Sequence, residues 1–151
     1  MRYLLDTQAV IWFIENNPRL SSTAKSFIED PDNIILVSQF SFIEIAIKEA
    51  LQKLSLKNGL ESLIKEAERQ DIQVLNLNQN HILAYKNIPL HENHRDPFDR
   101  MILATAFSEK LSIITSDEKF SWYAPLIDVI CSKQETIEEL RRRVGELENV
   151  K

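Results

Sequence analysis

Short runs of β-prone residues alternate with helical stretches along this chain, and that alternation limits the folds it can adopt. The strand-like runs are residues 3–5, 34–37, 73–77, 111–115 and 126–130. Between them, apolar residues recur at helical spacing at Leu60, Leu63, Ile64 and Ala67, and residues 98–107 are apolar on nearly every side. Strands and helices in this order are typical of βαβ units. The sequence therefore predicts an α/β fold with a short, mainly parallel central sheet.

The scarcity of glycine and cysteine excludes several classes of site. Two glycines, Gly59 and Gly145, are too few for a P-loop or a dinucleotide fingerprint. The Gly-x-Ser-x-Gly pattern of a serine nucleophile is absent. The single cysteine, Cys131, forms no intrachain disulfide and no multi-cysteine zinc site, which fits a reducing cytoplasm.

Charge and hydropathy point to a soluble cytoplasmic protein with no membrane partner. The first apolar stretch ends at Asp6, too early for a signal peptide. No apolar run approaches the roughly 18 residues of a membrane span. The net charge of -5 opposes undirected binding to a polyanion. Any contact with nucleic acid therefore needs local positive charge.

The composition changes near the end of the chain. Residues 132–151 hold five basic and five acidic side chains. Their apolar residues recur at coiled-coil spacing, at Ile137, Leu140, Val144 and Leu147. We predict one domain over residues 1–131 and a charged helical tail over 132–151. The tail has two interpretations. It is either a solvated helix whose apolar stripe packs against its own domain or a contact between subunits, and we favour the first.

Acidic residues follow several of the predicted strands. Asp6 directly follows the first, and Glu44 lies near the start of the helix after the second. Asp99 opens the apolar helix, and Asp117 comes two residues after the strand that ends at Thr115. The carboxyl ends of parallel strands meet at one edge of a sheet, where ligands bind. We therefore expect these carboxylates to lie together.

Four carboxylates in one place require a positive partner. At ~4 Å and an effective dielectric of about 20, each like-charged pair repels by about 4 kcal/mol before screening. An all-oxygen set of ligands suits Mg2+ or Mn2+ better than zinc. The sequence therefore predicts a divalent metal site.

Each acid also has a structural interpretation as part of a helix N-terminus. Asp6, Asp96 and Asp117 stand before predicted helices, where aspartate is a strong N-cap. Ser41 and Glu44 match a capping box. Taken singly, capping is the simpler explanation for each, but independent caps have no reason to gather at one edge. Their joint position favours the metal site.

The histidines offer no rival centre in the sequence. His91 and His94 lie in a loop-like segment before Asp96, and a third zinc ligand is missing there. His81 falls in a helical stretch, where we expect it at the surface or half-buried.

Four segments together resemble a known family. They are Leu4–Thr7, Ser38–Ile45, Asp96–Ala106 and Ile114–Asp117. In order and spacing, over residues 1–131, they resemble a PIN domain, and more closely the VapC-type toxins of bacterial type II toxin–antitoxin systems.

The resemblance implies a three-layer PIN-like fold and a Mg2+-dependent endoribonuclease, with Mn2+ as an alternative metal. It implies an RNA substrate, inhibition by a cognate antitoxin, and a homodimer. Carried over by position, the catalytic and metal-binding residues are Asp6, Glu44, Asp99 and Asp117. The residues expected to contact substrate or support the site are Thr7, Asp96, Arg100 and Ser116. Metal-assisted hydrolysis of a phosphodiester would follow, without a histidine base.

This chain differs from the family pattern in two places, and one alternative function stays open. Similar sequences often carry histidine where this chain has Gln8, and the tail from residue 132 extends past the usual end of the family. The alternative function is a catalytically inactive PIN-like scaffold that acts through protein binding. A haloacid dehalogenase-type phosphatase is disfavoured, because a second aspartate two positions after Asp6 is lacking.

Overall fold

Five parallel strands form the central sheet of the computed structural model, which describes residues 1–133 and 137–149. The strands are β1 (Arg2–Leu5), β2 (Ile34–Ser38), β3 (Gln73–Leu75), β4 (Ser112–Thr115) and β5 (Val129–Cys131), in the order β3-β2-β1-β4-β5. Every neighbouring pair is parallel. This confirms the predicted α/β class. The fifth strand begins later than predicted, because Ile127 packs in the core beside Tyr123 instead of joining the sheet.

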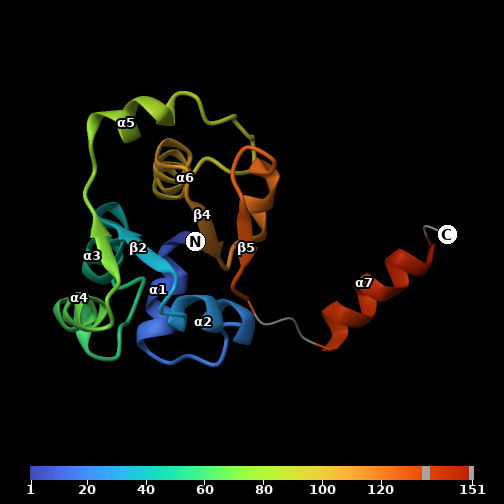
Figure 1. Ribbon diagram of the computed structural model, residues 1–151, viewed down its shortest axis with the longest axis horizontal. Helices are drawn as coiled ribbons and strands as arrows, with labels where there is room; N and C mark the ends of the chain where they lie inside the picture. Colours follow the sequence, from blue (N-terminus) through green and yellow to red (C-terminus); the bar gives the residue numbers. More distant parts are fainter. Residues whose placement is uncertain (134–136, 150–151) are drawn as a thin grey trace.

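Helices cover both faces of the sheet (Figure 1). They are α1 (Thr7–Ile14), α2 (Ser22–Glu29), α3 (Gln39–Ala50), α4 (Gly59–Arg69), α5 (Gln79–Tyr85) and α6 (Pro97–Glu109), with a 3-10 helix η1 (Glu118–Tyr123) after β4. Figure 1 shows α5 and α6 on one side of the sheet and α1, α2 and α4 on the other. The predicted three-layer arrangement is confirmed.

Alternating side chains of the strands supply two cores. In β1, Tyr3 and Leu5 join the core that packs against α1, α2 and α4. Leu4, between them, joins the core against α5, α6 and η1. Successive residues of a strand point to opposite faces, so an apolar run of this kind is buried on both sides. β1 is therefore buried on both faces from Tyr3 to Leu5, and its end is fixed in place.

The register of the sheet brings the ends of β1 and β4 together. Leu5 pairs with Ile114, and the Asp6 N–H donates to the Ile114 carbonyl at 2.9 Å. Residues that follow these two strands consequently lie side by side. The chain leaves β1 at Asp6 and β4 at Ser116, so the sheet itself places the predicted site residues at its carboxyl edge.

Helix α3 begins three residues earlier than the predicted capping box requires. Ser38 is the N-cap, and its Oγ accepts from the Phe40 N–H at 3.1 Å. Ser41 lies inside the helix, and its buried hydroxyl has no hydrogen-bond partner among the described residues. The prediction of a box between Ser41 and Glu44 is therefore wrong, and the Glu44 carboxylate is free for other partners.

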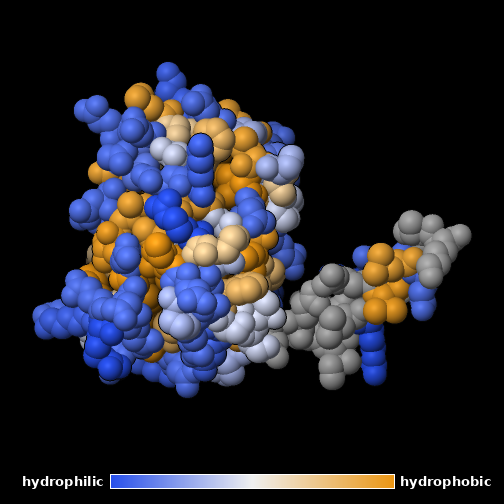
Figure 2. Space-filling view, in the orientation of Figure 1, coloured by the Kyte–Doolittle hydropathy of each residue, from blue (hydrophilic) through white to orange (hydrophobic). Residues whose placement is uncertain are grey.

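The tail contains a helix, α7 (Ile137–Asn149), as predicted. Figure 1 shows α7 apart from the sheet and its covering helices, and Figure 2 shows hydrophobic surface on it. Val144 is 53% exposed and Leu147 is 68% exposed. The expectation that this stripe lies on its own domain is wrong for these two residues. The side chains of Ile137 and Leu140, and residues 134–136 and 150–151, are outside the described part.

No helix among the described residues is both long enough and apolar enough to cross a membrane.

The two-sided burial of β1 predicts a large loss of stability when its central residue is shortened. Leu4→Ala should lower the free energy of unfolding by about 2–5 kcal/mol, because it opens a cavity in a fully buried position. Leu83→Ala, on α5 at 62% exposure, is the control and should change it by no more than about 0.5 kcal/mol. Urea denaturation at neutral pH measures both. Equal losses would contradict the placement of Leu4.

Candidate metal and catalytic site

A pocket of about 250 Å3 opens at the carboxyl edge of the sheet. Every predicted site residue except Arg100 lines it, namely Asp6, Thr7, Glu44, Asp96, Asp99, Ser116 and Asp117. We call this the acidic pocket. Its other lining residues include Gln8 and one cationic side chain, Lys48. The structure therefore gathers carboxylates from four segments that are far apart in the sequence.

Asp6 is buried at the floor of this arrangement and is held by three donors. Its Oδ1 accepts from the Ala9 N–H at 2.7 Å, which caps α1. Its Oδ2 accepts from the Thr115 hydroxyl and from the Ser116 N–H at 3.1 Å. Burial raises the pKa of Asp6 from 3.8 to about 6, although these hydrogen bonds act to lower it. The charge of Asp99 raises it further.

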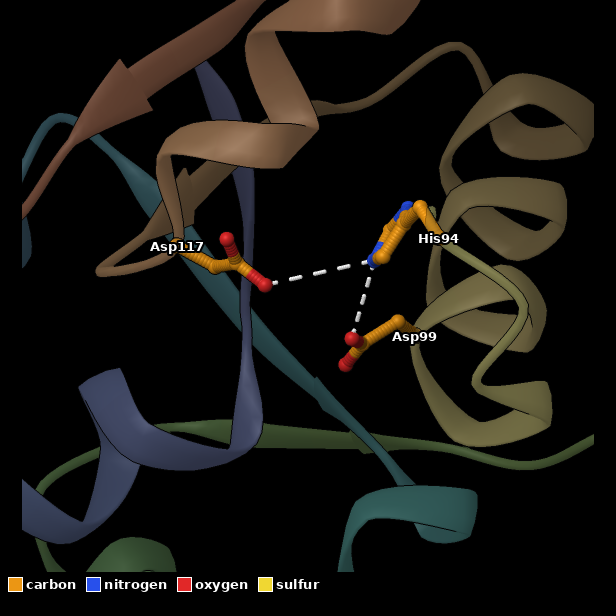
Figure 3. Close-up of side chains that lie close together, drawn as sticks. All are labelled: His94, Asp99 and Asp117. Carbon is orange, nitrogen blue, oxygen red and sulfur yellow. Dashed lines mark hydrogen bonds and ion pairs between the residues drawn. The ribbon is translucent and has the colours of Figure 1, made fainter. Parts of the chain in front are cut away.

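Asp99 lies in the first turn of α6, facing His94 and Asp117 (Figure 3). His94 Nε2 is 3.0 Å from Asp99 Oδ2 and 3.9 Å from Asp117 Oδ2. Burial raises the pKa of Asp99 to about 6, the hydrogen bond with His94 acts to lower it, and the charges of Asp96 and Asp117 add to the rise. Like charges therefore crowd this side of the pocket.

Glu44 already has a cation and a hydroxyl as partners. Its Oε1 accepts from the Thr7 hydroxyl at 2.7 Å, and its Oε2 accepts from Lys48 Nζ at 2.5 Å. The hydrogen bond with Glu44 is the main reason that the pKa of Lys48 is raised. Lys48 thus offsets the charge of Glu44, whereas Asp6 and Asp99 have no lysine or arginine partner among the described residues.

Three of the acids cap helices while they line the pocket. Asp96 is the N-cap of α6, and its Oδ1 accepts from the Phe98 N–H at 2.8 Å, with Pro97 at the first helical position. Asp117 caps η1, with its Oδ1 accepting from the Lys119 N–H at 2.9 Å. The capping interpretations of Asp6, Asp96 and Asp117 are confirmed.

Arg100 does not line the acidic pocket, and of the two roles predicted for it, contact with substrate or support of the site, its position fits support. Its side chain is buried, and its guanidinium donates to the carbonyls of Ile88 at 3.0 Å and Pro89 at 2.9 Å. It also stacks on the Tyr85 ring, 4.9 Å from the centroid. The guanidinium therefore holds the segment after α5 in place. It is not among the residues that line the acidic pocket.

His94 is the residue that sequence analysis missed. A turn closed by the His94 N–H and the His91 carbonyl, 3.0 Å apart, brings its ring inward. His94 is 3% exposed, and its Nδ1 lies 2.8 Å from the Tyr123 hydroxyl. Its ring lies near the carboxylates of Asp99, in the first turn of α6, and Asp117, which caps η1, and not with His91 in a zinc site. The sequence offered one indication of this contact, namely that His94 stands five residues before Asp99.

His81 also differs from its prediction, because it is fully buried. Its backbone N–H and ring complete a capping box with Asn78 at the start of α5, and its Nε2 lies 2.7 Å from Glu109 Oε1. It serves the packing of α5 on α6 and is not part of the acidic pocket.

The donor chemistry of the acidic pocket fits a divalent cation. Burial raises the pKa of both Asp6 and Asp99, and nearby carboxylates raise each further. A bound cation would offset that effect, and carboxylate oxygens are the ligands that Mg2+ and Mn2+ prefer. His94, Asp99 and Asp117 offer ligand atoms that all lie within 4.8 Å of one another.

Comparison with known proteins identifies the fold. A family model described as PIN domain matches residues 3–126. The solved structure of VapBC2 from Rickettsia felis, bound to a promoter DNA fragment, is similar at a TM-score of 0.66 and 16% identity, covering 87% of this chain and 98% of that one. VapBC-1 from nontypeable Haemophilus influenzae is similar at 0.60 and 21% identity, covering 87% and 98%.

A toxin–antitoxin complex from Klebsiella pneumoniae is similar at a TM-score of 0.59 and 20% identity, covering 88% of this chain and 99% of that chain. No curated protein matches the sequence. At these identities the structural matches establish the shared fold, and the residues of the acidic pocket have to be judged by their own chemistry.

The raised pKa of Asp6 predicts a stability that falls as pH rises. Below pH 3.8 the carboxyl is protonated in folded and unfolded chains alike, but between about pH 4 and 6 the folded chain retains the proton more strongly. The free energy of unfolding should therefore decline across that window and level off above it. A shift from 3.8 to about 6 corresponds to about 3 kcal/mol.

Asp6→Asn keeps a good N-cap and removes the charge, so the decline should become smaller by up to about that amount. Chemical denaturation in chelator from pH 4 to 7.5 measures it. Asp32→Asn, at an exposed position outside the acidic pocket, is the matched control. An unchanged decline in Asp6→Asn would show that Asp6 is not the buried titrating group.

Proposed function

The chain belongs to the PIN domain family, and from this premise we propose that it is a divalent-metal-dependent endoribonuclease that hydrolyses RNA phosphodiester bonds. The single observation that carries the proposal is the meeting of Asp6, Asp99 and Asp117 in one pocket at the carboxyl edge of the sheet. In open parallel α/β sheets this edge is where ligands bind.

The proposed metal ligands are Asp6, Asp99 and Asp117, with Glu44 completing the set. When bound, Mg2+ or Mn2+ would supply the positive charge that lets a phosphate enter an acidic pocket and would lower the pKa of the attacking water. Asp6 is kept in position at the wall of the pocket by Thr115 and Ser116, so its side chain is fixed before a cation binds. The proposal needs no general base from the protein.

Positive side chains near the pocket would guide the RNA backbone. Arg95 and Lys119 are exposed, and each is a near neighbour in sequence of a pocket acid. Lys119 Nζ donates to the Asn93 carbonyl at 3.0 Å, which holds it beside the loop that carries His94. Phosphate contacts of this kind add affinity without sequence preference.

We further propose that the chain is a VapC-type toxin, inhibited by a cognate antitoxin and acting as a homodimer. Support comes from the similar structures, two of which hold VapBC proteins and one of which is a toxin–antitoxin complex. An inhibitor would act by covering the acidic pocket.

Cleavage of RNA by the purified chain should require both the metal and Asp99. With Mg2+ the wild type should cut a single-stranded RNA, and chelator should abolish the cut. Asp99→Asn should reduce the rate roughly 100-fold, the scale on which loss of one electrostatic group slows an active site. Asp32→Asn is the matched aspartate control and should retain the wild-type rate. Cleavage that survives both chelator and Asp99→Asn would place the activity outside the acidic pocket.

Expression in bacteria tests the toxin proposal separately. The wild-type chain should arrest growth, and Asp99→Asn should not, at equal protein levels. If a short reading frame lies immediately upstream of the gene, co-expression of its product should relieve the arrest and yield a complex in pull-down. Growth arrest by Asp99→Asn would point instead to the scaffold alternative, in which binding alone is harmful.

A further inference from the structure

We propose that His94 is a direct nitrogen ligand of the metal site, together with Asp99 and Asp117, so that the site prefers a first-row transition cation such as Mn2+ or Co2+ over Mg2+. The inference rests on the proposed function, because it shares two carboxylates with the acidic pocket. It replaces an all-oxygen site with a mixed nitrogen and oxygen site.

The distances around His94 are those of ligands on one cation. Its Nε2 lies 3.0 Å from Asp99 Oδ2 and 3.9 Å from Asp117 Oδ2. Two ligand atoms that are each about 2.1 Å from one ion are about 3.0 Å apart at a right angle and about 4.2 Å apart on opposite sides. Both observed separations fall in that interval. The ligand atoms of His94, Asp99 and Asp117 all lie within 4.8 Å of one another, so small side-chain adjustments would bring all three onto one cation.

The ring of His94 is held with Nε2 directed at the carboxylates, as Figure 3 shows. It packs against the rings of Phe120, Trp122 and Tyr123. The Tyr123 hydroxyl lies 2.8 Å from Nδ1. A metal-ligating histidine generally fixes its other nitrogen by such a contact, and a phenol can accept as well as donate. Tyr123 thus leaves Nε2 available for a cation.

His94 differs from the other histidines in the charges that it faces. His81 Nε2 contacts a single carboxylate, that of Glu109, between α5 and α6. His91 packs edge-on against Tyr123, 4.9 Å between centroids, and no ion pair of its ring is present among the described residues. Imidazole favours transition cations, whereas Mg2+ selects oxygen ligands. A nitrogen between Asp99 and Asp117 should therefore bias the choice of metal.

A structural role for His94 is the competing explanation. In it, Nε2–H donates to Asp99 and holds that carboxylate in position, while the metal sees oxygen ligands alone. The two explanations differ in whether nitrogen touches the ion, and this can be measured directly.

The experiment is pulsed electron paramagnetic resonance of Mn2+ bound to the full chain. A coordinated imidazole gives nitrogen-14 modulation, and incorporation of nitrogen-15 histidine should replace it with the nitrogen-15 pattern. We expect the modulation in the wild type and in His91→Gln, the matched histidine control. We expect its loss in His94→Gln, together with a drop of roughly tenfold or more in the ratio of Mn2+ to Mg2+ affinity.

Tyr123→Phe is a second variant that keeps the inference testable if His94→Gln does not fold. It should keep the nitrogen modulation and weaken Mn2+ binding about 10–100-fold, because the ring loses its supporting contact. Mn2+ that binds to the wild type without nitrogen modulation overturns the inference and leaves the nuclease proposal standing. Absence of any Mn2+ binding, with no cleavage of RNA, overturns both.

Discussion

The burial of Asp6 at the end of β1 is the constraint around which the site is arranged. β1 is the middle strand and is covered on both faces, so Asp6, which directly follows it, is buried. A buried carboxylate is costly unless hydrogen bonds or a cation compensate it. The fold supplies donors from α1 and from the end of β4, and these act against the rise in its pKa without abolishing it. Because the pKa of Asp6 remains raised, a positive ion nearby would stabilise its charged form.

Helix capping and site formation are carried out by the same carboxylates. Asp117 illustrates the division, because its Oδ1 accepts from the Lys119 N–H while its Oδ2 faces His94. Asp6 divides in a similar way between α1 and the end of β4. In Asp117 the cap fixes one oxygen with a backbone donor and leaves the other facing His94, whereas both oxygens of Asp6 accept hydrogen bonds. The capping interpretation, which the structure confirms, is therefore compatible with the proposed metal site.

Much of the fold could be predicted from the sequence, because strand periodicity and the order of elements are local signals. The edge at which Asp6, Asp99 and Asp117 meet followed from the general geometry of parallel sheets. His94 could not be found in this way, because its partners Asp99 and Tyr123 meet it only after α6 and η1 pack. The prediction of the N-cap of α3 was wrong for a related reason. Ser38 and Ser41 are both suitable caps, and the pairing of β2 in the sheet determines that the strand ends at Ser38.

Arg100 holds the loop that carries His94 next to helix α6, a contact that the sequence did not reveal. It follows Asp99 on α6, and it binds the carbonyls of Ile88 and Pro89, which begin the loop that carries His94. Tyr123 then joins that loop to η1, the helix capped by Asp117. These carbonyls compensate the desolvation of the buried guanidinium. His94, Asp99 and Asp117 are thus held near one another by buried contacts outside the pocket, so the proposed cation would meet side chains that are already in place.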